Sequence, residues 1–290
     1  MGRVHRRTVI KALAATATLS ACSAQQTPRP QPSPPAPSDS EETEPSGSAP
    51  AHSLPIRTQQ LSLARGKARP LPTTVWRPAG GGPYPLILFS HGLQATPQSY
   101  AEMLGSWARA GFVVAAPAYP HTAGTAADYN PLDVLNQPAD ASYVIGEVVK
   151  RGGVDEQRIA AGGHSAGGIT TLGMFTTRDE RLRAGVVLAG RQIIKTPLTG
   201  PAVPLLFVHG KRDRTVAYAD GHAVYDAVTW PKAFLTFPGG GHVATGAELD
   251  VVIATSTDFW RWSLYGDPAA KARLAKDATR GGHATLADRL

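Results

Sequence analysis

The stretch RIAAGGHSAGG, residues 158–168, decides the fold. An apolar run ends in glycine, Ser165 stands between Gly163 and Gly167, and further small residues follow. A serine in this pattern is either a nucleophile on a strained strand-to-helix turn or one serine in a glycine-rich loop. The first interpretation requires a strand before Ser165, a helix after it, and an acid and a base further along the chain.

Strand-like and helix-like segments alternate from about residue 54 onward. Short apolar runs, typical of strands buried on both faces, stand at 85–92, 112–119, 158–165, 184–190, 204–210 and 233–239. Segments with helical spacing stand at 97–111, 138–152, 166–175, 216–228 and 246–264. This alternation predicts an α/β fold with a mostly parallel central sheet and helices on both faces. In such a sheet the site lies at the carboxyl ends of the strands.

Two further residues follow strand ends in the order that a catalytic triad requires. Asp213 comes just after the strand expected at 204–210, and His242 comes just after the strand at 233–239. A serine needs a base to take its proton, and the base needs an acid to orient it. The order Ser165, Asp213, His242 therefore predicts a nucleophile, an acid and a base at one edge of the sheet.

Other histidines and aspartates fit these roles less well. His164 adjoins Ser165 but should diverge from it on a sharp turn and support the loop, and His209 ends a buried strand and should be packed and hydrogen-bonded. His222 and Asp220 fall on an expected helix, and Asp155 precedes the nucleophile strand. None of these replaces Asp213 or His242 as a triad member.

Two loops can supply the oxyanion hole and the walls of a cleft. The backbone amide of Ala166 stands at a helix N-terminus, and the amide of Leu93 follows the strand at 85–92. The alternative for the second loop is a simple strand-to-helix turn. Tyr119 and His121, after the strand at 112–119, are candidate substrate-lining residues, and a purely structural turn is the alternative there.

The motifs FSHG, NQPADASYVI, GGHSAGG, VHGKRDRTV and GGGH together resemble those of α/β-hydrolases. Residues from about 55 to 265 resemble the bacterial serine hydrolases grouped with dienelactone hydrolases, platelet-activating-factor acetylhydrolases, chlorophyllases and cutinase-like polyester hydrolases. The resemblance implies an α/β-hydrolase fold and esterase chemistry. It also implies Ser165 as nucleophile, His242 as base, Asp213 as acid and the amides of Leu93 and Ala166 as oxyanion hole. Leu93 stands where the polyester hydrolases usually have an aromatic residue.

The N-terminal stretch has the pattern of an export signal. Residues 1–21 combine a basic start, a short apolar run and small residues, and RRTVIK resembles a twin-arginine signal, with a general secretory signal as the alternative. The only cysteine, Cys22, ends LSAC, which resembles a bacterial lipobox. We expect a lipid such as palmitate on Cys22 and a protein anchored at the outer face of the bacterial cell membrane. An ordinary secretory signal with an incidental cysteine is the alternative.

Composition limits the remaining possibilities. Residues 22–53 are rich in proline and serine and should form a disordered linker before a hydrolase domain at 54–290. The net charge of the chain is +7. Without residues 1–21 there are 25 basic and 22 acidic residues, and the basic ones are scattered along the sequence. We expect no nucleic-acid partner, metal or organic cofactor, and a monomer.

The expected function is a serine carboxylic ester hydrolase at the cell envelope. The connection at 190–203 is too short for a helical lid, so Leu93, Tyr119, His121 and this connection should line a shallow cleft. A shallow cleft favours short-acyl or otherwise accessible esters, including polymeric ones, without interfacial activation. The alternatives are an acyltransferase or peptidase with the same triad, and a non-catalytic envelope-binding lipoprotein.

Overall fold

A single sheet organises the part of the chain that the structure describes. A computed structural model gives residues 47–290, which contain nine strands in the order β1-β2-β4-β3-β5-β6-β7-β8-β9. Strands β4, β3, β5, β6, β7 and β8 are parallel neighbours, so the predicted mostly parallel sheet is confirmed. The strands are β1 (Ile56–Ala64), β2 (Pro70–Pro78), β3 (Tyr84–Ser90), β4 (Val113–Pro117), β5 (Val154–His164), β6 (Leu182–Leu188), β7 (Leu205–Gly210), β8 (Lys232–Phe237) and β9 (Thr285–Arg289).

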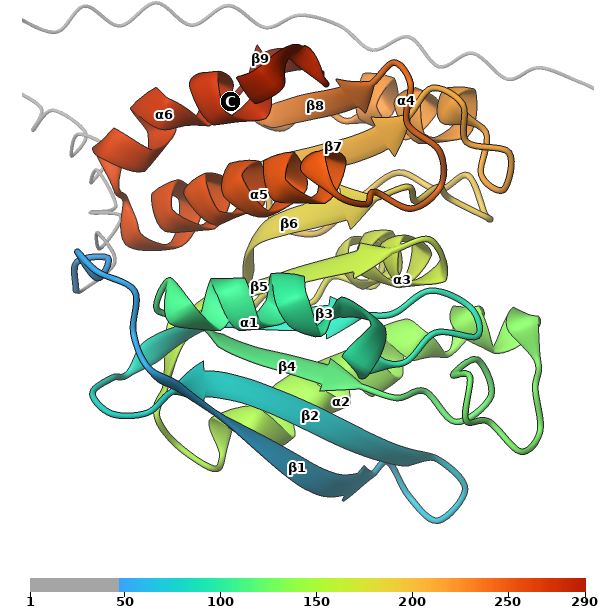
Figure 1. Cartoon of the computed structure of the whole chain (residues 1–290). Helices are drawn as coiled ribbons and strands as arrows, with labels where there is room; N and C mark the ends of the chain where they lie inside the picture. The colour runs from blue at the N-terminus through green and yellow to red at the C-terminus, as the bar shows by residue number, and fades with distance from the viewer. Residues whose placement is uncertain (1–46) are drawn as a thin grey trace, which may run out of the picture. The chain divides into compact units, whose positions relative to one another are not determined.

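Helices cover both faces of the sheet and enclose a separate core on each (Figure 1). Helices α1 (Ala101–Arg109), α5 (Ala247–Tyr265) and α6 (Pro268–Ala278) contribute to one core, in which Trp107 and Trp260 meet edge to face. Helices α2 (Gln137–Val149), α3 (Ala166–Thr176) and α4 (Tyr218–Ala227) contribute to the other. Residues 47–290 also contain three short 3₁₀ helices: η1 (Pro97–Tyr100), η2 (Pro131–Leu135) and η3 (Arg280–Gly282).

Antiparallel strands lie at both edges of the sheet (Figure 1). At one edge β1 pairs with β2 and β2 with β4, so the first two strands form a hairpin. At the other edge β9 pairs with β8, from Lys232 opposite Arg289 to Thr236 opposite Thr285. The sequence did not predict β9, since its short pattern gives one half-buried leucine among exposed residues.

The folded part begins before residue 54. Gly111 adopts a φ of 103° and lies against the ring of Pro50, and the Arg261 guanidinium donates to the Pro50 carbonyl at 2.9 Å. Residues 47–53, predicted as the end of the linker, thus contact the domain. The predicted signal, Cys22 and most of the linker lie outside the described residues. Within residues 47–290, no helix has the length and hydropathy needed to cross a membrane.

Candidate active site

Ser165 occupies a strained turn between β5 and α3. Strand β5 ends at His164, helix α3 begins at Ala166, and Ser165 has φ 57° and ψ −117°. A side chain at Gly163 would collide with the Gly167 carbonyl, and one at Gly167 would collide with the Ser90 carbonyl. Only glycine fits at both positions, so the chain can reverse tightly and hold a half-exposed serine at the carboxyl edge of the sheet.

Asp213 and His242 meet at the same edge. Each follows a strand, β7 and β8 respectively, and the His242 Nδ1–H donates to Asp213 Oδ2 at 2.7 Å. The other carboxylate oxygen accepts from the amides of Thr215 and Val216 at 2.8 and 2.9 Å. Burial acts to raise the pKa of Asp213, but the imidazole and the two amides outweigh it and hold the pKa below its ordinary value. The acid is therefore ionised and its orientation is fixed.

His209 also touches this carboxylate. It is buried, as expected from its strand-end position, and its Nε2 lies 3.0 Å from the Val216 carbonyl and 3.2 Å from Asp213 Oδ2. Both neighbours are oxygens, so Nε2 carries the proton and shares it between them. His209 thus contacts the same carboxylate oxygen as His242.

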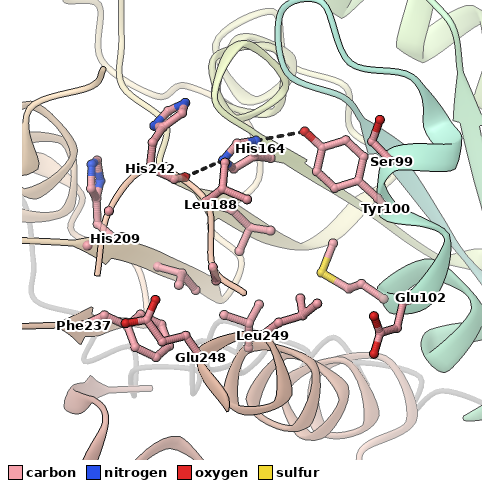
Figure 2. A pocket seen from close by; sticks show the side chains of 18 residues that line it. Ser99, Tyr100, Glu102, His164, Leu188, His209, Phe237, His242, Glu248 and Leu249 are labelled. Carbon is pink, nitrogen blue, oxygen red and sulfur yellow. Dashed lines mark hydrogen bonds between the residues drawn. The ribbon is translucent and has the colours of Figure 1, made fainter. Parts of the chain in front are cut away.

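His164 links three parts of the site, as Figure 2 shows. The Gly92 amide donates to the Tyr100 hydroxyl at 3.1 Å, and the hydroxyl donates to His164 Nδ1 at 2.9 Å. His164 Nε2–H donates to the His242 carbonyl at 2.8 Å. Because the chain starts at an amide that only donates and ends at a carbonyl that only accepts, its direction is fixed. Burial lowers the pKa of His164 to about 4, which keeps the ring neutral.

A second buried histidine shapes the loop that carries Leu93. His91 accepts from the Tyr119 amide through Nε2 at 3.1 Å, so its Nδ1–H donates to the Gly92 carbonyl at 2.7 Å. Burial lowers the pKa of His91 to about 4. A side chain on Gly92 would lie 3.3 Å from the Ser165 Cβ, so this loop runs directly beside the serine. The Leu93 side chain is 41% exposed at the rim.

Tyr119 and His121 have different surroundings from those of the triad residues. Tyr119 is 1% exposed, and its hydroxyl is 2.7 Å from Ser90 Oγ, so it supports the loop from inside. His121 is half-buried and donates to the Asp128 carbonyl at 3.0 Å. Both line a hollow next to Pro70 and Pro72 whose lining does not include the triad residues.

The other acidic and histidine side chains considered from the sequence are engaged elsewhere. Asp220 pairs with Arg191 and His222 with Asp226, both at the surface, and Asp155 pairs with the buried Arg158. None of them touches His242 or Asp213.

A cavity of about 130 Å³ lies beside the His242 backbone, on the face of the sheet covered by α1 and α5. His164, Tyr100 and His242 contribute polar atoms, and Met103, Leu188 and Val252 contribute apolar surface. His242 itself keeps 18% of its side chain exposed, so the imidazole can reach a reacting group.

The order of the strands and the turn at Ser165 can now be compared with known proteins. The order of the strands is that of an α/β-hydrolase fold. The sequence profile of the chlorophyllase family matches residues 45–181, from the start of the domain to the end of α3 and just beyond. The putative esterase YitV of Bacillus subtilis (strain 168) is 26% identical over 190 residues, which cover 50% of this chain and 74% of the relative. The chain is therefore similar to the chlorophyllase family over its first half and to one putative esterase.

Sequence reasoning did not find Tyr100. The residue ends a 3₁₀ helix with no motif around it, and its partner His164 is 64 positions further along the chain. No local signal reveals such a contact. A tyrosine shortly after the Gly92–Leu93 loop and a histidine just before Ser165 are the two features that, taken together, could have suggested it.

Proposed function

We propose that this α/β-hydrolase is a serine carboxylic ester hydrolase. Ser165 is the nucleophile, His242 the general base, Asp213 the acid that orients it, and the amides of Leu93 and Ala166 form the oxyanion hole. The observation that supports this best is the 2.7 Å bond from His242 Nδ1 to the buried Asp213 carboxylate, at the edge that also holds Ser165 at φ 57°. Backbone strain of this kind gathers at functional positions.

The proposed reaction proceeds in two steps. His242 Nε2 takes the proton of Ser165 as its oxygen attacks the ester carbonyl carbon, and the same nitrogen returns the proton to the leaving alcohol. The carbonyl oxygen becomes negative and is stabilised by the two amides. Water then attacks the acyl carbon while His242 takes its proton. The bond to Ser165 breaks, His242 returns that proton to the Ser165 oxygen, and the carboxylic acid is released. An acyltransferase or peptidase would use the same groups with a different acceptor or leaving group.

Covalent labelling tests the nucleophile directly. A fluorophosphonate reacts with an activated serine, so it should label the wild-type protein on Ser165, as located by mass spectrometry of peptides. Ser165→Ala should abolish labelling. Ser106→Ala should not, because it changes a serine on α1 whose hydroxyl donates to the Glu102 carbonyl and accepts from Arg109. A folded wild-type protein that takes no label would favour the non-catalytic alternative.

For location we propose export and anchoring through a lipid on Cys22, which lies outside the described residues. The support is the sequence alone, with Arg6 and Arg7 before the apolar run and the single cysteine after it. Cys22→Ala should release the domain from the membrane fraction or block its maturation. An unmodified N-terminus downstream of Cys22 in the mature protein, measured by mass spectrometry, would contradict the anchor.

For substrate we propose esters that reach an uncovered site, beginning with short acyl groups. The connection between β6 and β7, residues 189–204, contains no helix, and Ile193, Ile194 and Leu93 are exposed around it. Nothing in these loops forms a helical cover over Ser165. Acetyl and propionyl esters should be hydrolysed in solution, with no increase in rate when the substrate forms micelles.

A further inference from the structure

One face of helix α3 carries both Ser165 and an apolar surface. The half-exposed residues from the nucleophile onward are Ser165, Ile169, Gly173 and Thr176, at spacings of four, four and three. That spacing places all of them along one side of an α-helix. The Ile169 amide bonds to the Ser165 carbonyl, so the first apolar side chain stands one turn from the nucleophile.

Ile169, Gly173 and Thr176 form the floor of a groove that begins one helical turn from Ser165, which does not itself line it. A cavity of about 210 Å³ lies between α3, the η2–α2 segment and the connection after β6. Its apolar lining comprises Val134, Leu135, Pro138, Ile169, Ile193 and Ile194. Leu135, Ile193 and Ile194 are 50, 43 and 61% exposed, so three large apolar side chains border an open channel. The lining contains no charged residue.

The position of His242 decides which half of an ester points toward the groove. The imidazole delivers a proton to the leaving alcohol, so the alcohol lies on the His242 side. That side borders the cavity next to α1 and α5, on one face of the sheet. The groove lies next to α2 and α3, on the opposite face, and neither Asp213 nor His242 lines it. The acyl group, bonded to Ser165 and directed away from the alcohol, faces the groove.

We propose that this groove binds the acyl chain of the substrate, and that the enzyme prefers linear saturated acyl groups of medium length to acetate. The proposal rests on the proposed function, and it replaces the short-acyl preference expected from the sequence with a preference for medium-length acyl chains. Each methylene that leaves water for the apolar lining strengthens transition-state binding by up to about fourfold. The gain should end when the chain reaches Thr177, which lines the groove at the end of α3.

A series of acyl esters with one leaving group tests the groove. For 4-nitrophenyl esters below their micellar concentration, kcat/KM of the wild-type enzyme should rise from acetate to hexanoate. The double variant Leu135→Ser/Ile194→Ser should reduce the hexanoate-to-acetate ratio about tenfold, because it removes two apolar walls. Thr177→Trp should lower the decanoate-to-acetate ratio of kcat/KM more than the butanoate-to-acetate ratio, because it blocks only the far end of the groove.

Leu132→Ser is the matched control. Leu132 stands beside the groove on η2, is 69% exposed and does not line it. The same leucine-to-serine change there should leave both the acetate rate and the hexanoate-to-acetate ratio as in the wild type.

A second series separates the two halves of the ester. Alkyl acetates of increasing alcohol length should show no difference in length dependence between the wild type and the double variant. A difference in this series, with none in the acyl series, would overturn the assignment of the groove to the acyl chain. A wild-type kcat/KM that falls steadily with acyl length would overturn it as well.

If the wild type hydrolyses no ester at all, the proposed function itself fails. If it hydrolyses acetate esters but kcat/KM falls with acyl length, only the assignment of the groove is refuted.

Discussion

At the scale of single residues, the triad should behave as one unit. Ser165→Ala and His242→Ala should each reduce kcat roughly 10⁴-fold or more, and the double variant should be little worse than either, because neither group acts without the other. Asp213→Asn should also be severe, since an amide favours the wrong histidine tautomer. Turnover of short esters measures these effects, with thermal unfolding as the check on folding. Normal turnover of a folded Asp213→Asn enzyme would identify a different acid.

Tyr100 should act as a positioning residue. Tyr100→Phe removes the hydroxyl that joins the Gly92 amide to His164, and leaves both groups without this partner. We expect kcat to fall about tenfold with little change in KM, because the oxyanion loop and the His242 backbone lose a common support. Tyr143→Phe on α2 is the control. Equal losses in both variants, or a fall in melting temperature with kcat unchanged, would assign Tyr100 a purely structural role.

At the scale of elements, Arg69 in the turn between β1 and β2 joins this hairpin to η2 and to α2. Arg69, after β1, donates to Asp133 at 2.8 Å and to Asp140 Oδ1 at 2.9 Å, and Arg65 donates to Asp140 at 2.7 Å. The Asp140 side chain has no solvent exposure. Arg69→Met should lower the free energy of unfolding by about 3–5 kcal/mol, because it leaves buried carboxylates without their main partner.

Chemical denaturation measures this loss, and Arg57→Met on the exposed part of β1 serves as its control. The Asn136 side-chain amide donates to Asp133 at 2.8 Å. A loss below about 1 kcal/mol at Arg69 would show that this bond and the Arg65 ion pair with Asp140 suffice to stabilise the two carboxylates.

The central elements were predictable because they are buried on both faces. Strand β3 and strand β5 have almost no polar residue in their apolar runs, and both are flanked by glycine. The turn at Ser165 was predictable because the two glycines that flank the serine form a local sequence pattern, even though the contact that requires Gly167 is with the distant Ser90. Strand β9 was not, because it is an exposed edge strand stabilised by pairing with β8. The same applies to Tyr100, whose role depends on a distant partner.

At the scale of the whole molecule, two buried histidines should make stability depend on pH. Burial lowers the pKa values of His91 and His164 to about 4, below the ordinary value of 6.5. Below pH 6.5 the unfolded chain takes up protons that the folded protein does not, so stability present above pH 6.5 is lost as the pH falls toward 4. Each histidine should account for roughly 1–3 kcal/mol over this range.

Urea denaturation between pH 4 and 7.5 should show this loss, and His164→Gln should have a shallower slope than the wild type. A free energy of unfolding that stays constant from pH 7 to pH 4.5 would mean that these rings accept protons in the folded state.

The last strand of the sheet has a practical consequence for handling the protein. Strand β9 covers the backbone of β8 from Lys232 to Thr236, the strand that leads to His242. Truncation before residue 285 would leave the amides and carbonyls of β8 exposed to pair with another chain. Shortened versions made for crystallisation should therefore self-associate in size-exclusion chromatography and recover less activity. An affinity tag is better joined through a flexible spacer after Leu290 than substituted for the strand.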